Sequence, residues 1–413
     1  MSRGRRSIAL VAAVALSASA CDWSQFRSDA AHTGNVYETE IGVGNVADLA
    51  PLWTVEHDLA LPGVITTDGA VVVVADAEVR AYEAATGGPR WAVPLPTIDE
   101  LHREWAPPSS RDGIVQVGYT DPLFSWGVHG GFLKIDAGTG VDTMVGSQGA
   151  VRSPATFVGD DVWYRYAEVG PMGQGAFTGI EGRLADGRTL RTLDSPTATG
   201  QGTPPAVAGG VAYAARGDGA FLEAYDADAT EGCSDAGTYR LCTPLWSAPV
   251  TGGARPAVSG STVFAATGTG VAAYATEGVR GPDQQPLWRA DVAGASAVAL
   301  DPAAAATRVF VGSSDGTLEA FAAGGCGGAT TCAPAWQGLA GGAVSAPAVA
   351  NGVVYAGSSD GFVHAFAAAG CGEATCPPVW SAPTPGAPTK VVVANGRVHV
   401  LTTTGELVAF GLP

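Results

Sequence analysis

The sequence predicts an all-β fold, an eight-bladed β-propeller of four-stranded antiparallel blades. Short runs rich in valine, tyrosine and phenylalanine are broken by glycine turns, as in "GVVYAGSSDGFVHAF", and no long segment has apolar residues at helical spacing. A tryptophan follows each of four successive hairpins, at Trp246, Trp288, Trp336 and Trp380, so the unit repeats about every 45 residues. This period is typical of a propeller blade.

Each blade is expected to hold strands A to D, counted from the propeller axis outward. The A–B–C part of the pattern occurs eight times, at residues 63–85, 106–139, 151–188, 203–228, 254–277, 294–323, 344–369 and 387–411. No D strand follows the last unit, whereas a D-like strand around Trp53 precedes the first. We therefore expect the ring to be closed by this N-terminal strand pairing with the C-terminal strands, which leaves no free sheet edge. A β-solenoid would not leave complementary fragments at its two ends.

The recurring tryptophans are interpreted as packing residues. One aromatic side chain per blade, at a fixed strand position, is typical of contacts between blades rather than of a substrate platform. This prediction covers Trp53, Trp91, Trp246, Trp288, Trp336 and Trp380.

The first twenty residues have the pattern of a signal peptide. Arginines precede a short apolar run, and small residues lead to Cys21 in "LSASAC". This ending resembles the lipobox of bacterial lipoproteins, with Cys21 as the lipidated residue; the alternative is ordinary cleavage after Ala20 and a secreted soluble protein. We expect a signal peptide at 1–20, an N-terminal tether or entry segment at 21–48, and a single propeller domain at 49–413.

The other six cysteines form three pairs that are close in sequence, each between strand C and strand D. Their spacing is wider than the tight pairs of zinc sites, and an exported protein meets an oxidising compartment. We therefore predict three local disulfides that staple glycine-rich loops: Cys233–Cys242, Cys326–Cys332 and Cys371–Cys376.

The composition restricts the partners. The formal net charge is −17, and the only lysines are Lys134 and Lys390. An acidic surface argues against binding to nucleic acid or to anionic lipid headgroups. We expect a monomeric propeller that meets the membrane only through an N-terminal lipid at Cys21, and that is located in the cell envelope.

Several segments resemble the repeat of the pyrroloquinoline-quinone-like (PQQ-like) propellers. "AYEAATGGPRW", residues 81–91, resembles the A-x-D-x-x-T-G-x-x-x-W repeat, with Glu83 in place of aspartate. "IDAGTGVDTM" keeps Asp136 and has Met144 where tryptophan is expected, and "DWSQFRSDAAHTG" looks like the opening segment of this family. The resemblance covers essentially the whole mature chain and implies the fold. It does not choose between enzyme and scaffold, because the family contains both.

The enzyme branch of the family implies features that the sequence does not offer. Its quinone-dependent dehydrogenases hold the cofactor with calcium, glutamate and asparagine ligands, a catalytic aspartate and often a disulfide between adjacent cysteines. No two cysteines are adjacent here, and of the four asparagines Asn351 and Asn395 fall in Asn-Gly turns, while Asn35 and Asn45 precede the first blade. The histidines show no metal-ligand spacing. We therefore predict no cofactor, neither PQQ nor calcium, no metal site and no catalytic residue.

The favoured function is a non-catalytic binding or scaffold propeller of the envelope, for which the outer-membrane assembly lipoprotein of the same family is an analogue. The alternative is a PQQ-dependent dehydrogenase or another propeller enzyme, such as a hydrolase. Three long connections, D to A or B to C, all emerge on one face, which we predict holds a protein or peptide partner. The candidate residues on it are His102, Arg103, Glu104, Trp105, Phe124, Trp126, His129 and Met172.

Overall fold

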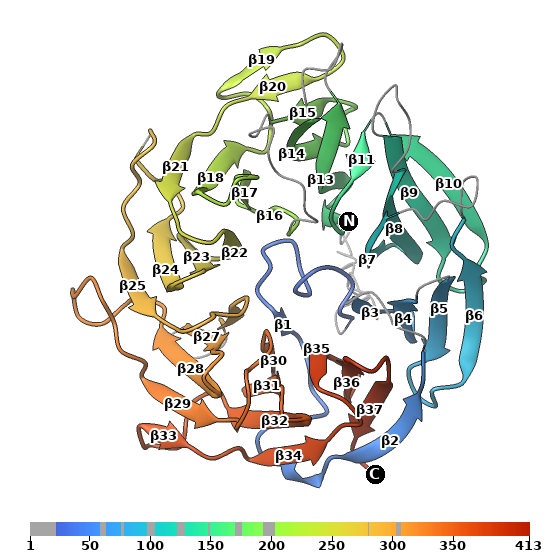
Figure 1. The fold of residues 1–413 in the computed structure, drawn as a ribbon, viewed down its shortest axis with the longest axis vertical. Coiled ribbons are helices and arrows are strands. Elements are labelled where there is room, and N and C mark those ends of the chain that lie inside the picture. Colours follow the sequence, from blue (N-terminus) through green and yellow to red (C-terminus); the bar gives the residue numbers. More distant parts are fainter. Residues whose placement is uncertain are drawn as a thin grey trace, which may run out of the picture.

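The protein is a ring of eight β-sheets around a central axis (Figure 1). The computed structural model describes residues 22–57, 63–75, 78–96, 104–121, 129–147, 149–169, 176–192, 203–279, 281–302 and 307–413. The predicted signal peptide and Cys21 lie outside these residues. Each blade is an antiparallel meander of four strands, which confirms the predicted fold class.

Blades 1 to 4 take up the first half of the propeller. Blade 1 consists of β3 (Val64–Thr67), β4 (Ala70–Val74), β5 (Glu78–Glu83) and β6 (Pro89–Pro94). Blade 2 consists of β7 (Glu104–Arg111), β8 (Ile114–Asp121), β9 (His129–Asp136) and β10 (Asp142–Ser147). Blade 3 has a divided inner strand and consists of β11 (Ala150–Val151), β12 (Thr156–Val158), β13 (Asp161–Val169), β14 (Ala176–Arg183) and β15 (Thr189–Arg191). Blade 4 consists of β16 (Ala206–Ala208), β17 (Val211–Ala215), β18 (Phe221–Asp226) and β21 (Trp246–Pro249).

Blades 5 to 8 complete the ring. Blade 5 consists of β22 (Ala254–Ser259), β23 (Thr262–Thr267), β24 (Gly270–Ala275) and β25 (Trp288–Asp291). Blade 6 consists of β26 (Ala299–Asp301), β27 (Arg308–Gly312), β28 (Thr317–Ala322) and β29 (Trp336–Leu339). Blade 7 consists of β30 (Ala348–Ala350), β31 (Val353–Ser358), β32 (Phe362–Ala367) and β34 (Trp380–Pro383). Blade 8 consists of β35 (Pro388–Ala394), β36 (Arg397–Thr402), β37 (Leu407–Gly411) and β2 (Ala50–Val55).

The N-terminal strand closes the ring as the sequence predicts. Strand β2 pairs antiparallel with β37, from Ala50 opposite Gly411 to Val55 opposite Leu407, and so supplies the outer strand of blade 8 (Figure 1). The Asn-Gly turns at Asn351 and Asn395 join strands A and B of the last two blades, and both asparagines have positive φ. Such turns match the twist of paired strands.

The tryptophans join neighbouring blades, as predicted. Five of them donate an indole N–H, at 2.8 to 3.1 Å, to a carbonyl of the following blade: Trp53 to Ala84, Trp91 to Ala137, Trp246 to Thr276, Trp288 to Ala323 and Trp380 to Leu49. A glycine of the following blade gives the ring room. At Gly370 a Cβ atom would lie 2.7 Å from Cδ1 of Trp336. At these junctions a loop of the following blade thus packs against the indole of its predecessor.

The three predicted disulfides are formed, and each lies in a C–D loop that reaches the preceding blade. The hairpin of β19 (Cys233–Asp235) and β20 (Arg240–Cys242) pairs in parallel with the outer strand β15 of blade 3. Strand β33 (Thr375–Cys376) does the same with β29 of blade 6. Between blades 5 and 6, the amide of Cys332 donates to the carbonyl of Arg289 at 2.8 Å. These three cysteine loops are therefore latches between blades rather than free excursions.

Of the segment 21–48, expected as a tether or entry segment, residues 23–38 lie inside the ring, and the chain then runs out to β2 at the rim (Figure 1). Their backbone carbonyls accept hydrogen bonds from the inner strands of six blades in chain order: Trp23 from Thr66, Ser24 from Ser110, Ala30 from Val207, Ala31 from Val258, Thr33 from Leu300 and Gly34 from Val349. The side chains of Gln25 and Glu38 accept from Phe157 of blade 3 and Gly396 of blade 8. Strand β1 (Asn35–Val36) runs parallel to β30. This axial segment, residues 23–38, therefore contacts every blade.

The described part of the chain holds one short 3-10 helix, η2 (Val46–Asp48), and no described helix has the length and apolarity to cross a membrane. Buried valine, alanine and aromatic side chains between adjacent sheets form the core.

We predict that Gly370→Ala lowers the melting temperature more than Gly372→Ala does. Both glycines have positive φ and lie in the same loop, so both substitutions carry the backbone cost of about 1 kcal/mol. Only the methyl group at residue 370 meets the Trp336 ring, which adds overpacking of about 1–3 kcal/mol; nothing lies within 4 Å of a Cβ at residue 372. Calorimetry measures the difference, and equal melting temperatures would contradict the proposed joint.

Removal of a cysteine latch is predicted to loosen the preceding blade as well as its own loop. A Cys371→Ser, Cys376→Ser variant loses about 2–3 kcal/mol in the chain-entropy model of short disulfide loops. The amide of Gln337, which donates to the carbonyl of Ala374 at 2.8 Å, should then exchange its proton faster. Hydrogen exchange with mass spectrometry tests this. Unchanged protection of Gln337 would show that the loop merely closes on itself.

Candidate functional site

A cavity of about 480 Å³ lies on the axis. Six blades contribute Val64, Pro107, Pro154, Thr203, Ala295 and Ala346 to its wall, and blades 5 and 8 contribute Arg255 and Lys390. Trp23, Gln25, Phe26 and Arg27 of the axial segment line it as well. The wall residues lie just before the inner strands or in their N-terminal halves. The hydrogen bonds of the axial segment are made nearer the C-terminal ends of these strands. The segment is therefore a floor, and the cavity opens towards the face of the D–A and B–C connections.

Three cationic side chains converge on this axial cavity. Arg27 is 8% exposed and donates to the carbonyl of Val298 at 2.6 Å, and Arg255 donates to the carbonyl of Ala295 at 2.9 Å. Lys390 is half-buried, and its ammonium makes no hydrogen bond to a described residue. No aspartate or glutamate is among the described residues that line the cavity. The cavity is thus a cationic site in a strongly acidic chain.

This clustering of positive charge changes the acidity of its members. Burial, and then the charges of Arg27 and Arg255, lower the pKa of Lys390 to about 8. Burial likewise lowers the pKa of Arg27 to about 10, although Asp29 opposes the shift. Each cation costs free energy when it is withdrawn from water without a counter-ion, so an anion in the cavity would relieve that cost.

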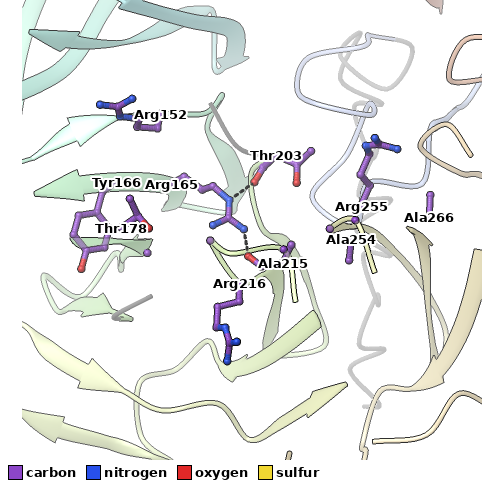
Figure 2. A pocket seen from close by; sticks show the side chains of 15 residues that line it. Arg152, Arg165, Tyr166, Thr178, Thr203, Ala215, Arg216, Ala254, Arg255 and Ala266 are labelled. Carbon is purple, nitrogen blue, oxygen red and sulfur yellow. Dashed lines mark hydrogen bonds between the residues drawn. The ribbon is translucent and has the colours of Figure 1, made fainter. Parts of the chain in front are cut away.

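A second pocket, of about 230 Å³, adjoins the first and is lined by four arginines (Figure 2). Arg165 of β13 donates to the carbonyls of Thr203, at 2.9 Å, and Ala215, and so joins blade 3 to blade 4. Arg152, Arg216 and Arg255 line the same opening. Thr203 and Arg255 belong to both pockets. We call this the arginine pocket.

Two of these arginines are also ion-paired on the surface. Arg152 lies 3.2 Å from the Glu104 carboxylate, and Arg216 lies 2.6 Å from that of Asp218. Arg216 also covers the ring of Phe221, with its guanidinium carbon 4.1 Å from the ring centroid. Exposed pairs of this kind are weak, so their partners can be exchanged for the carboxylates of a ligand.

The residues predicted as the binding face are only partly described. Glu104 is exposed and pairs with Arg152 beside the arginine pocket. His129 is the first residue of β9, but its side chain is not described. The other predicted residues lie entirely outside the described part of the chain: His102, Arg103, Phe124, Trp126 and Met172. Trp105 is 7% exposed and packs in the hydrophobic core, with its ring centroid 5.6 Å from that of Tyr119. Its replacement by alanine should therefore destabilise the fold.

Arg27, Arg255 and Lys390 were missed by the sequence analysis. The sequence does contain one indication of the site. Lys390 is one of only two lysines in the chain, and it directly precedes the apolar run "VVVA". The side chain of Lys390 borders the axis because of the bulge between Pro388 and Lys390. No local sequence pattern predicts this bulge.

The histidines are packing residues where they are described. The Nδ1 atom of His364 lies 2.8 Å from the hydroxyl oxygen of Ser381, and the ring packs between those of Phe362 and Phe366. His32 and His399 are fully buried, which lowers the pKa of each to about 3. Among the described residues, no group of three or more histidine, cysteine or acidic side chains is placed to hold a metal ion.

Comparison with solved structures shows the PQQ-like propeller fold. BamB from Moraxella catarrhalis superimposes with a TM-score of 0.57 at 17% identity, covering 88% of this chain and 99% of that one. Quinohemoprotein alcohol dehydrogenase from Comamonas testosteroni gives 0.64 at 14% identity, over 95% and 80% of the two chains. A europium-containing methanol dehydrogenase gives 0.63 at 11% identity, over 95% and 98%. No protein-family model matches the sequence, and no curated protein is significantly similar to it.

The titration of Lys390 is directly measurable, because the chain has one other lysine. After reductive ¹³C-methylation, we predict that the Lys390 resonance titrates with a midpoint near 8 and that Arg255→Gln moves the midpoint upward. The folded amine loses its proton near pH 8, whereas the unfolded one keeps it to about 10.4, so this group makes stability rise with pH across that window. An ordinary lysine midpoint would contradict the cationic cavity.

Proposed function

We propose that the protein is a non-catalytic binding propeller of the cell envelope whose D–A and B–C face holds a protein or peptide partner with an acidic segment. The observation that most supports this proposal is the arginine pocket, which adjoins the cationic cavity. Its opening is lined by Arg152, Arg165, Arg216 and Arg255. In a chain with a net charge of −17 this is a local reversal of sign. Complementary potentials steer a partner to such a patch and fix its orientation.

The chemistry of the patch favours carboxylates on a polypeptide. The planar guanidinium group of arginine pairs with a carboxylate through two parallel hydrogen bonds, and arginine is enriched among the residues that dominate interface energies. An acidic segment could exchange places with Glu104 and Asp218, the carboxylates that now neutralise Arg152 and Arg216. The remaining predicted contacts, His102, Arg103, Phe124, Trp126, His129 and Met172, belong to connections whose flanking strands end on this face.

The proposed lipid at Cys21 would orient this face. Asp22, the next residue, accepts from the side chain of Asn395 at 3.1 Å and from the amide of Asp68 at 3.2 Å, both in A–B turns. A lipid attached one residue earlier would hold the A–B face, which also carries the C–D loops and their disulfides, towards the membrane. The arginine pocket would then face away from it. Three disulfides are typical of an exported protein, which supports the compartment.

The alternative function is quinone-dependent oxidation, because one of the similar structures is a quinohemoprotein alcohol dehydrogenase and another is a methanol dehydrogenase. Calcium is held by carboxylate and amide oxygens, and the described cavity lining offers no acidic side chain and no asparagine. Its one side-chain amide is that of Gln25, whose oxygen already accepts a hydrogen bond from the amide of Phe157. The described lining therefore does not fit a calcium-assisted quinone site. A hydrolase remains the other alternative, without a nucleophile motif in its favour.

The chain offers a matched pair of arginines to test the face. Arg216 and Arg188 are both partly exposed, and each lies 2.6 Å from an aspartate two residues away. Arg216 follows strand B of blade 4, on the proposed face, whereas Arg188 lies in a C–D turn on the opposite face. We predict that Arg216→Glu weakens binding of a fluorescent hexaglutamate peptide by about tenfold and that Arg188→Glu leaves it unchanged.

Fluorescence anisotropy at several salt concentrations measures this binding, which should weaken as salt rises. Equal losses for the two variants would mean that the peptide follows overall charge, and no binding to the wild type would refute an acidic partner at this face.

A further inference from the structure

Lys390 stands apart from the cations around it, because it can become a neutral amine. A bulge between Pro388 and Lys390 shifts the pairing of β35 with β36, a device that re-aims a side chain, and Lys390 borders the axial cavity. The guanidinium groups of Arg27 and Arg255 line the same cavity, whose described wall contains no carboxylate. No described residue accepts a hydrogen bond from the Lys390 ammonium. The site thus pairs one potential nucleophile with two permanent cations.

This arrangement is suited to a particular class of small molecule. A lysine next to other cations and withdrawn from water is activated as a nucleophile towards carbonyl compounds. Arginine, which remains charged, binds carboxylates. The floor formed by Trp23 and Phe26 adds an apolar surface, and about 480 Å³ lies within the range of small-ligand pockets.

We propose that the axial cavity binds a small 2-oxo carboxylate, whose carboxylate pairs with the arginines and whose carbonyl carbon forms a reversible imine with Lys390. The amine nitrogen forms a bond to the carbonyl carbon, the carbonyl oxygen leaves as water with the two protons of the amine, and hydrolysis restores both partners. No oxidant or reductant takes part. The inference does not rest on the proposed protein partner. Arg255 lines both pockets, but Lys390 and Arg27 line the axial cavity and not the arginine pocket.

Because the chain has two lysines, Lys134 serves as the control for Lys390 within one sample. The full mature protein is incubated with pyruvate and cyanoborohydride at pH 7.5, which reduces an imine to a stable secondary amine, and peptide mass spectrometry then locates the adduct. We expect Lys390 to be modified about tenfold or more in excess of Lys134, because a pKa of about 8 leaves a substantial neutral fraction. Equal modification of the two lysines would overturn the proposal.

A second arm tests the role of the carboxylate. Acetone has a carbonyl group of similar size and no charge, so it should modify Lys390 about tenfold less than pyruvate does, and Arg255→Gln should narrow that difference. Equal yields with acetone and pyruvate would reduce the site to a reactive amine without anion recognition and refute the ligand class. Lys390→Arg, which keeps the charge, should abolish the adduct. If the wild-type protein forms the pyruvate adduct but does not bind hexaglutamate, the proposed acidic partner is refuted and the 2-oxo carboxylate site is not.

Discussion

The rest of the structure depends on the hydrogen bonds between the axial segment and the inner strands. Residues 23–38 present one acceptor after another to blades 1 to 8 in order, mostly through backbone carbonyls. Inner strands of a propeller otherwise have unpaired amides at the channel, which are costly to leave without partners. The segment satisfies these amides and at the same time blocks the channel. An open tunnel thereby becomes a cavity with one mouth, and Arg27 is carried onto its floor.

The outer rim is held by two other devices. Tryptophans join most neighbouring blades, and the cysteine loops add a short parallel strand to the preceding sheet at two junctions and a single parallel bridge at a third. Blade 2 has Met144 at the position where six other blades have tryptophan. There the contact with blade 3 is made by an edge-to-face pair, with the Phe132 and Tyr164 centroids 5.1 Å apart. All three cysteine loops lie within the arc of blades 3 to 7.

Much of this architecture could be predicted from the sequence, because the repeat is local. Hairpins and their Asn-Gly turns, the tryptophan positions and the complementary fragments at the two ends identify eight blades and their closure. The cysteine pairing was also readable, but the role of the loops was not, since the strand that β33 joins belongs to the previous repeat. The same limit applied to the candidate site. Arg27, Arg255 and Lys390 are far apart in sequence and meet only because all eight inner strands surround one axis.

The axial segment has a consequence for how the protein is made. Its residues are synthesised long before Gly396, whose amide donates to Glu38, and long before β37, which pairs with β2. Neither contact can form until residues 396–411 have been synthesised. Contacts of such long sequence separation also slow folding. The order of synthesis therefore keeps a shorter nascent chain from closing the ring, and closure can only follow the synthesis of blade 8.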